Sequence, residues 1–92
     1  MNLSASEKKS LRRIAHHLEN VIIVGEQGVS EGVIAETSRA LGDHELIKVK
    51  FALTDRLDRR AATTALADAC GAEVVQQIGK VSVLYKANPK AD

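Results

Sequence analysis

The chain has 92 residues, of which 45% are hydrophobic, 27% charged and 2% aromatic, and its formal net charge is +1. Its length suits one small domain with a modest core, and its charge excludes both a strongly charged disordered tail and a broadly basic protein. Phe51 and Tyr85 are too few for the aromatic platform on which single-stranded bases stack, so composition and charge both weigh against a nucleic-acid partner.

A helix and a short strand are predicted first. Ser4 and Glu7 have the spacing of a capping box, which marks the start of a helix. Apolar residues then recur at helical spacing and form one stripe: Leu11, Ile14, Ala15 and Leu18. We expect this helix to end at Asn20. The apolar run Val21–Val24 that follows predicts a strand that is covered on both faces.

A loop, a second helix and a second strand come next. After the loop Gly25–Gly28, Ser30 fits the N-cap of a helix that runs to about Leu41, with Gly42 in the left-handed position that closes it. The segment Glu45–Leu53 then alternates, with one side formed by Ile47, Val49 and Phe51 and the other by Lys48 and Lys50. This alternation predicts a strand with one buried and one solvated face.

A third helix and a hairpin complete the chain. Thr54 or Asp55 fits the N-cap of the helix, and Gly71 fits its end. The narrow apolar stripe of this helix is expected to consist of Leu57, Ala61, Ala65, Leu66 and Ala69. The hairpin is expected to consist of two strands and a two-residue turn with glycine first: Glu73–Ile78, Gly79-Lys80 and Val81–Lys86.

This order of elements, α-β-α-β-α-β-β, predicts a two-layer α/β domain with a four-stranded mixed sheet. Strand–helix–strand units pair in parallel through right-handed crossovers, whereas the closing hairpin must be antiparallel. We expect one domain over residues 1–86 and a frayed tail over residues 87–92. No segment has the layout of a signal peptide or approaches the ~20 apolar residues that span a bilayer, so we expect a cytoplasmic protein with no membrane partner.

The loop Gly25–Gly28 is the strongest local sign of a binding site. Glycines let a ligand approach the backbone, because no Cβ stands in the way, and the free N–H groups at the start of the next helix carry partial positive charge. The loop therefore suits a phosphate, although the same spacing also fits a tight turn without a ligand. Val29 stands where a Walker loop needs lysine, and Glu26 would repel a phosphate unless it points away.

Basic residues gather in two segments, although the net charge is small. Residues 1–18 contain four basic residues and one acidic residue, and residues 47–60 contain five basic and two acidic, so each segment carries +3. The acids lie mostly around the second predicted helix, at Glu31, Glu36, Asp43 and Glu45. A phosphate backbone requires several cations at once, and the candidates are Arg12, Arg13, Lys48, Lys50, Arg56, Arg59 and, more weakly, Lys80.

Catalysis and metal binding find little support in the residues. His16 and His17 are consecutive, so they diverge on a helix instead of converging on a metal. Cys70 is the single cysteine, which excludes an intramolecular disulfide and a cysteine-based zinc site. Its place at the end of a helix disfavours a thiolate, so we expect it to be buried. We therefore predict no enzymatic activity, no metal, no cofactor and no small-molecule substrate.

Four stretches of sequence point to one protein family. They are Leu3 with Leu11-Arg12, Val24–Glu31, His44–Lys50, and Gln77–Lys80 with Val83–Tyr85. Together they resemble the bacterial YhbY-type proteins, the stand-alone form of the CRM domain (chloroplast RNA splicing and ribosome maturation). The Glu-Leu-Ile-Lys-Val-Lys run and the Ile-Gly-Lys turn are the specific parts, and the likeness extends from Leu3 to Lys86.

The resemblance implies a fold similar to the C-terminal domain of bacterial translation initiation factor three, with sheet order 1-2-4-3 and the last strand antiparallel to the others. It also implies binding to RNA and association with precursors of the large ribosomal subunit, without enzymatic activity. The family's GxxG loop corresponds to Gly25–Gly28 and is comparable with the loop by which KH domains clamp a nucleic-acid backbone. Many members carry a basic or small residue where this chain has Glu26.

The leading hypothesis is a domain that binds ribosomal RNA by backbone and shape during assembly of the large subunit. The RNA backbone would approach Gly25 and Gly28, beside Gln27, and the N–H groups of Val29 and Ser30 would donate to a phosphate. The alternative is a protein-interaction module that docks on a ribosomal protein or assembly factor through the acidic surface of the second helix. A small nucleotide-binding protein is a third possibility, disfavoured because no lysine follows the glycines.

Overall fold

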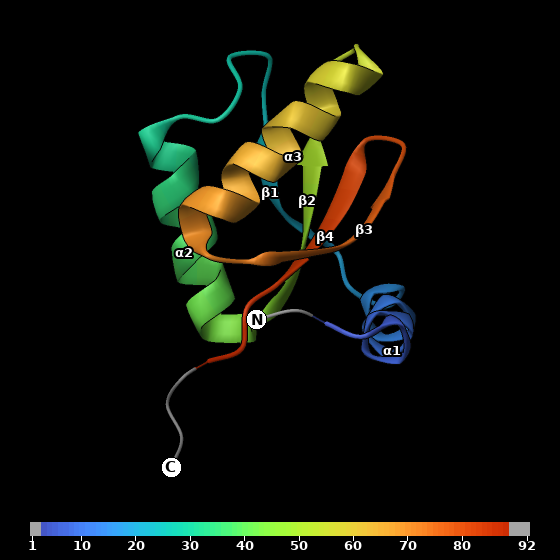
Figure 1. The fold of residues 1–92 in the computed structure, drawn as a ribbon. Helices are drawn as coiled ribbons and strands as arrows, with labels where there is room; N and C mark the ends of the chain where they lie inside the picture. The colour runs from blue at the N-terminus through green and yellow to red at the C-terminus, as the bar shows by residue number, and fades with distance from the viewer. Residues whose placement is uncertain (1–2, 89–92) are drawn as a thin grey trace.

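Three helices and one four-stranded sheet form the structure, a computed structural model that describes residues 3–88 (Figure 1). In chain order the elements are α1 (Ala5–Ala15), β1 (Asn20–Val24), α2 (Glu31–His44), β2 (Leu46–Phe51), α3 (Arg56–Cys70), β3 (Glu73–Ile78) and β4 (Val81–Tyr85). Within residues 3–88, no helix combines the length and the hydropathy needed to cross a membrane.

The sheet is mixed, as predicted. Its strand order is β1-β2-β4-β3, with β1 parallel to β2 and β4 antiparallel to both of its neighbours. β1, β2 and β3 therefore run in one direction, and their carboxyl ends meet at one end of the sheet, where the β3–β4 turn also lies (Figure 1). The α/β class, the strand order and the antiparallel last strand are all confirmed.

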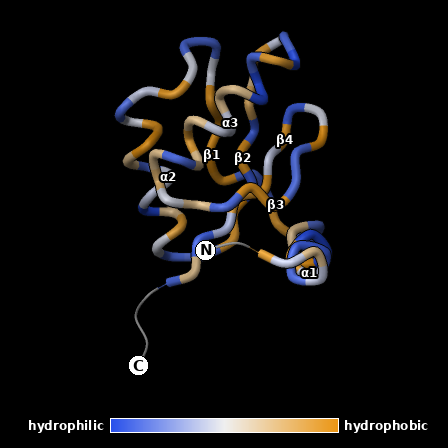
Figure 2. Tube along the Cα trace, in the orientation of Figure 1, coloured by the Kyte–Doolittle hydropathy of each residue, from blue (hydrophilic) through white to orange (hydrophobic). Residues whose placement is uncertain are grey.

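Helices α2 and α3 cover one face of the sheet and enclose the main hydrophobic core (Figures 1 and 2). Among its largest fully buried side chains are Phe51 and Leu84 from the sheet, Leu41 from α2 and Leu66 from α3. Burying a side chain of this kind contributes roughly 1.5–3 kcal/mol relative to leaving it exposed. The inner face predicted for α2 is confirmed, since its residues lie against this core or are buried: Val33, Ile34, Thr37 and Leu41.

Helix α1 covers part of the opposite face of the sheet. The predicted two layers describe the sheet with α2 and α3, and α1 adds a partial third layer near the amino ends of β2 and β3. Its Ala15 packs with Leu46, Val75 and Val83, which are apolar residues on that face that would otherwise meet water. The predicted capping box holds its start, because Ser4 Oγ accepts from the Glu7 N–H and the Ser4 N–H donates to Glu7 Oε1.

Helix α1 ends earlier than the prediction, at Ala15 instead of Asn20. A tight turn follows it, in which the N–H of His17 donates to the Ile14 carbonyl oxygen at 3.1 Å and the N–H of Leu18 donates to that of Ala15 at 3.0 Å. These bonds span three residues, as in a 3₁₀ turn, so the chain leaves the helix axis and enters β1. The apolar stripe is also narrower than predicted, because Ile14 is 54% exposed.

Helix α2 runs three residues longer than the prediction, through Gly42 to His44. Gly42 does not adopt a positive φ; the residue that does is Glu45, whose φ is 64°. The Glu45 N–H donates to the Leu41 carbonyl oxygen at 2.8 Å and so closes the helix. A glycine near the end of a helical pattern predicts a closure, but the hydrogen bond available at Glu45 extends the helix past it.

The burial of β1 and α3 corrects two further predictions. β1 is covered on one face, because Ile22 and Val24 are buried whereas Val21 is 50% and Ile23 66% exposed. The buried side of α3 consists of Thr63, Leu66, Ala67 and Cys70, whereas four of the five residues predicted for its stripe are exposed: Leu57, Ala61, Ala65 and Ala69. Alanines occur around the whole circumference of α3, so their spacing does not identify the buried face. The predicted N-cap Asp55, the helix end at Gly71 and the burial of Cys70 are confirmed.

The beginning of the predicted C-terminal tail lies against the end of α2. The Asn88 N–H donates to Glu45 Oε2 at 2.9 Å, and Asn88 Nδ2 donates to the Gly42 carbonyl oxygen at 3.0 Å. The second bond satisfies a carbonyl of the last helical turn that has no partner within the helix. Residues 89–92 of the predicted tail lie outside the described part of the chain.

Candidate nucleic-acid interface

The loop Gly25–Gly28 forms a tight turn that leaves open space beside both glycines. The Gly28 N–H donates to the Gly25 carbonyl oxygen at 2.9 Å, and Glu26 and Gln27 are exposed at the tip. Gly28 has a φ of +83°, which favours glycine, whereas Gly25 has no positive φ. A Cβ at either glycine would meet no atom within 4 Å. A ligand can therefore approach the backbone of both.

The start of α2 follows directly from this loop. Ser30 is the N-cap, as predicted, and its Oγ accepts from the Val33 N–H at 3.2 Å. Val29 packs against the main core and so anchors the loop to the domain. Helix starts carry partial positive charge, and α2 begins at the same end of the domain as the loop (Figure 1). Glu31, in the first turn, reduces that charge.

Three loops are joined at the carboxyl end of the sheet. The Ala52 N–H donates to the Val24 carbonyl oxygen at 2.8 Å and ties the exit of β2 to the exit of β1. The Phe51 N–H donates to the Lys80 carbonyl oxygen at 2.7 Å and ties β2 to the β3–β4 turn. These bonds hold the GxxG loop, the start of α3 and the hairpin turn at fixed separations, as a binding site with contributions from several loops requires.

Arg59 braces this end of the domain. Its Nε donates to the Gly79 carbonyl oxygen at 3.1 Å, and its Nη1 donates to the carbonyl oxygens of Leu53 and Thr54, both at 2.7 Å. The guanidinium fork thus connects α3, the β2–α3 loop and the hairpin turn. Arg59 was predicted to bind phosphate, and the structure shows that two of its nitrogen atoms already bond to backbone.

A buried polar cluster lies next to Arg59 and helps to hold the same end of the domain. Thr63 Oγ1 donates to the Arg59 carbonyl oxygen at 2.8 Å and lies 2.8 Å from Ser82 Oγ. Gln77 Nε2 donates to Thr63 Oγ1 at 3.3 Å. The Thr63 hydrogen is directed to Arg59, so Ser82 must be the donor of their shared bond. Together these bonds join α3 to both strands of the hairpin and fix the position of its turn.

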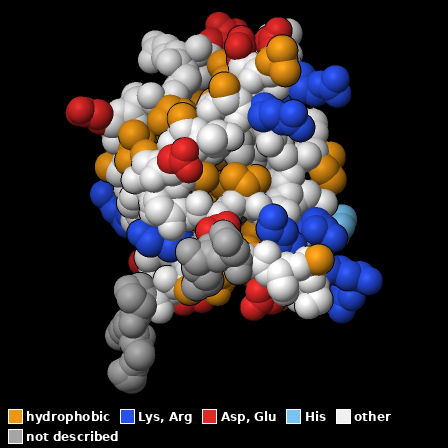
Figure 3. All heavy atoms as spheres, viewed as in Figure 1, with side chains coloured by type: hydrophobic (Ala, Val, Ile, Leu, Met, Phe, Trp, Pro, Cys, Tyr) orange, Lys and Arg blue, Asp and Glu red, His pale blue; other side chains and the backbone are white. Residues whose placement is uncertain are grey.

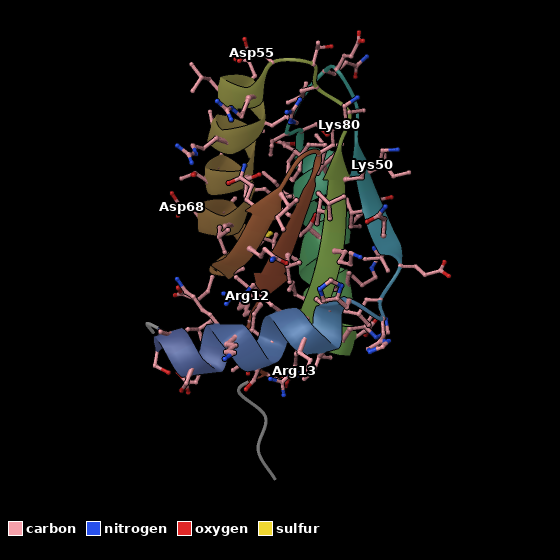
Figure 4. The ribbon with its side chains drawn as sticks, turned by 90° about the vertical axis from the view of Figure 1, so that its right-hand side faces the viewer. Arg12, Arg13, Lys50, Asp55, Asp68 and Lys80 are labelled. Atoms are coloured by element: carbon pink, nitrogen blue, oxygen red, sulfur yellow. The ribbon has the colours of Figure 1, made fainter. Side chains whose placement is uncertain are left out.

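Helix α1 covers only part of its face of the sheet. The uncovered part of this face carries a row of side chains across all four strands. The register aligns Ile23 of β1 with Lys50 of β2, Lys50 with Val81 of β4, and Val81 with Ile78 of β3. Ile23 is 66% and Ile78 64% exposed, and Lys50 is also exposed. Lys80 extends from the adjacent turn (Figure 4). This open face therefore combines apolar contact area with cations and lies next to the three joined loops.

A groove of about 230 Å³ separates this row from α1. Its lining consists of Ala15, His16, Lys48, Gln76, Ile78, Val81 and Val83. Lys48 is half-buried, and its Nζ donates to the Leu18 carbonyl oxygen at 3.2 Å, just beyond α1. Lys48 therefore connects β2 to the turn after α1 and adds positive charge to the floor of the groove.

The predicted cations of α1 lie at the far side of the groove from the loops. In Figure 4, Arg12 lies on the side of α1 toward the sheet and Arg13 on the side away from it, whereas Lys50 and Lys80 lie near the opposite end of the sheet. Arg12 is half-buried and Arg13 is exposed. Figure 3 shows two groups of Lys and Arg side chains on the right of the molecule, one over α1 and one beside the start of α3.

The structure thus brings most predicted site residues to one end of the sheet and leaves a minority elsewhere. The loop residues Gly25, Gln27, Gly28, Val29 and Ser30 share that end with Lys50, Arg56, Arg59 and Lys80; Lys48 lies in the groove, and Arg12 and Arg13 lie on α1. Sequence reasoning missed Ile23, Gln76, Ile78 and Val81. The alternation in the hairpin could have placed Ile78 and Val81 on one face, whereas Ile23 could be assigned only once β1 was known to be an edge strand.

Other chemistry has no comparable arrangement in the described part of the chain. Among residues 3–88, no three His, Cys, Asp or Glu side chains gather so that they could hold a metal ion. Phe51 is 1% exposed and so cannot stack, and Tyr85 is half-buried against the cluster beneath α1, at the opposite end of the sheet from the GxxG loop. What remains is a surface of cations, aliphatic side chains and open glycine backbone.

Comparisons with known proteins place the chain in one family. A protein named "Probable RNA-binding protein PA4753", from Pseudomonas aeruginosa, is 51% identical over 90 residues, which cover 98% of this chain and 86% of that protein. A Haemophilus influenzae protein named "RNA-binding protein" is 43% identical over 89 residues, covering 97% of this chain and 90% of that one.

A solved structure and a family model agree with these relatives. The solution structure of the hypothetical protein SAV1595 from Staphylococcus aureus superposes with a TM-score of 0.86 at 28% sequence identity, and the match covers 99% of this chain and 95% of that one. The model of the CRS1/YhbY (CRM) domain matches residues 3–86. The resemblance found in the sequence is therefore confirmed, and the chain belongs to the CRS1/YhbY (CRM) domain family.

Proposed function

We propose that this protein binds RNA along the open face of its sheet and at the GxxG loop. The observation that carries the proposal is the row Ile23–Lys50–Val81–Ile78, with Lys80 beside it, next to a loop whose glycines have open space around them. Lysines neutralise phosphates, and aliphatic side chains can contact sugars and bases. Two relatives named as RNA-binding proteins support the same class of ligand.

The mode of recognition follows from which side chains are exposed. Because Phe51 is buried and Tyr85 lies at the other end of the sheet, the surface beside the loop suits recognition of the RNA backbone and its shape. Lys50, Lys80 and Arg56 would contact phosphates near the loops, and Arg12 would do so across the groove. Arg59 and Lys48 act mainly by holding the surface in place, because both are bonded to backbone carbonyl oxygens.

We further propose that the RNA is ribosomal and that the protein acts in the cytoplasm on particles that precede the large subunit. This part of the proposal rests on the family, whose members associate with such particles. Ultraviolet crosslinking in cells, followed by sequencing of the attached RNA, tests it directly. Crosslinks concentrated in large-subunit RNA and its precursors are expected, and crosslinks spread over messenger RNA would refute the ribosomal part alone.

RNA binding itself is tested by the salt dependence of affinity for a fluorescent 20-nucleotide RNA, measured by anisotropy. If four phosphates are neutralised, log K should fall with log salt at a slope of about −3, because each phosphate on a single strand contributes about −0.7. The double variant Lys50→Gln/Lys80→Gln should bind more weakly, with a slope shallower by about 1.4.

The matched control is Arg39→Gln/Lys86→Gln, which removes the same charge. Arg39 is exposed on α2, and Lys86 is exposed at the other end of the sheet. Its slope should equal that of the unmodified protein. Equal losses in both double variants would mean that total charge, and not the open face, determines binding, and a flat salt response in the unmodified protein would refute the electrostatic mechanism.

A further inference from the structure

The outer edge of β1 is unpaired and lacks the usual protection. Within residues 3–88, β2 is the only strand that pairs with β1. β1 has the sequence Asn-Val-Ile-Ile-Val, without the lysine or proline that commonly protects an edge strand from pairing with another chain. A register irregularity near Val21 is the one protective feature of this strand. The other edge strand, β3, carries a glutamate and two glutamines. The β1 edge is therefore the one suited to receive another strand.

An apolar groove of about 290 Å³ opens beside the start of this edge. Its apolar lining comes from α1, the turn after it, β1 and β2: Ile14, Leu18, Val21, Leu46 and Ile47. The pairing of β1 with β2 begins at Asn20 and Lys48, so the first two residues of β2 extend beyond the start of β1 and form the floor. Ile14 is 54% and Val21 50% exposed. The groove has room for one or two large aliphatic side chains.

Acidic residues lie at the outer rim of the edge and the groove, whereas Lys48, bonded to the Leu18 carbonyl oxygen, lies on the side of the sheet. Glu19 lines the groove beside His44, and Asp43 lies in the last turn of α2. The end of a helix adds partial negative charge, and α2 ends at His44. Along the edge itself, residues 19–26 contain two glutamates, Glu19 and Glu26, and no Lys or Arg. A ligand of this surface should therefore carry positive charge next to apolar side chains.

We propose that the β1 edge and this groove dock an extended segment of a partner protein, with alternating aliphatic and Lys or Arg residues. The segment adds a strand to β1, so that backbone hydrogen bonds provide affinity and the groove selects an aliphatic side chain. Lys or Arg residues on either side of it face Glu19 and the end of α2. The groove lies at the amino end of β1, whereas the GxxG loop follows the carboxyl end of this strand, so a partner protein and RNA can bind together.

Charge argues against the two other occupants. A second copy that paired antiparallel through β1, centred on Ile22, would place Glu19 of one copy opposite Gly25 of the other and one residue from Glu26, and no Lys or Arg in that segment offsets the repulsion. RNA would bring phosphates to the groove at the amino end of the edge, where Glu19 forms part of the lining. A basic, aliphatic protein segment is the occupant that matches both the apolar groove and the acidic rim.

The test uses a defined synthetic peptide, acetyl-Lys-Val-Arg-Ile-Lys-Val-Arg-amide, titrated into the ¹³C,¹⁵N-labelled full chain and followed by NMR. We expect saturable shifts of the amides of β1, slower hydrogen exchange along its outer edge, and shifts of the Ile14, Val21 and Leu46 methyl groups. Val21→Ser should weaken binding at least fivefold. Glu19→Gln, which changes an exposed side chain and cannot disturb the core, should weaken it about threefold.

The matched controls distinguish binding at this site from nonspecific binding of the peptide. Ile78→Ser removes an aliphatic side chain of similar exposure, 64%, from the other edge strand, and should leave peptide affinity unchanged. The same peptide with Glu in place of Lys and Arg should not bind. The proposal is overturned if Ile78→Ser weakens binding as much as Val21→Ser, if the 20-nucleotide RNA displaces the peptide, or if the chain alone dimerises through β1 in sedimentation experiments.

Discussion

The substitution Gly25→Ala separates what the fold requires from what the ligand requires. Gly25 has no positive φ, and a Cβ built on it meets no atom within 4 Å. Alanine restricts the unfolded chain more than glycine does, so the free energy of unfolding should rise by about 0.5 kcal/mol. This corresponds to a melting temperature higher by roughly 2–4 °C for a domain of this size. Nothing in the unbound structure therefore explains the glycine.

RNA binding should respond in the opposite direction. If the RNA backbone contacts the loop where the added methyl group would stand, the affinity should fall about tenfold, or roughly 1.4 kcal/mol. Anisotropy with the 20-nucleotide RNA measures the affinity, and thermal denaturation measures the stability. Affinity within twofold of the unmodified protein would show that the RNA does not approach Gly25, and a lower melting temperature would show that the loop needs glycine for its own structure.

Gly28→Ala provides the contrast within the same loop. Gly28 has a φ of +83°, a conformation in which a side chain costs about 1–2 kcal/mol. Its melting temperature should fall by several degrees, roughly 4–8 °C for each kcal/mol. A loss of affinity in Gly28→Ala therefore mixes a distorted loop with a blocked ligand, whereas a loss in Gly25→Ala reports the ligand alone.

Two further predictions concern stability. Arg59→Lys keeps the charge but loses the fork that holds three carbonyl oxygens, so urea denaturation should show a loss of about 1.5 kcal/mol, and an unchanged midpoint would mean that the brace is dispensable. Thr37 has a hydroxyl that is buried without a hydrogen-bond partner in the described residues. Thr37→Val replaces this hydroxyl by a methyl group of similar size and should stabilise the protein by about 1 kcal/mol. A lower urea midpoint would show that the hydroxyl has a partner in solution.

The sequence was sufficient for the order of the elements and for the helix starts. Capping residues act locally, so Ser4, Ser30 and Asp55 could be identified from spacing alone, and each caps a helix in the structure. Helix ends were harder, because they depend on which carbonyl finds a donor after the helix. The end of α2 is set by Glu45 and supported by Asn88, which is 43 residues away in sequence.

Burial was predictable where polar and apolar residues alternate and unpredictable where they do not. In β2, the lysines between apolar residues identify the buried side, and Ile47, Val49 and Phe51 are indeed buried. In β1, four consecutive apolar residues contain no such signal. Whether both faces are covered depends on the strand's position in the sheet and on how far α1 extends, and neither is encoded within the strand itself.

The candidate site shows the same division. The GxxG loop and the cations could be named from the sequence, because glycine spacing and charge are local properties. The grouping of these residues at one end of the sheet could not be predicted, because it depends on the hydrogen bonds that join the loops at the ends of β1, β2 and β3. The double role of Arg59 was also invisible, because the carbonyl oxygens that it holds belong to three separate residues in two loops.

The early end of α1 accounts for both proposed surfaces. Five more helical residues would extend α1 by about 7.5 Å along its axis, carrying Leu18 and Glu19 away from the edge of the sheet. The turn at His16 and His17 instead brings Leu18 back, so that its carbonyl oxygen accepts from Lys48 Nζ. The short helix leaves open the part of the sheet face around Lys50, where we propose that RNA binds. The turn after the helix supplies Leu18 and Glu19 to one wall of the groove beside β1. A single local departure from the periodic pattern therefore separates a basic face from an acidic edge, in a domain whose net charge is +1.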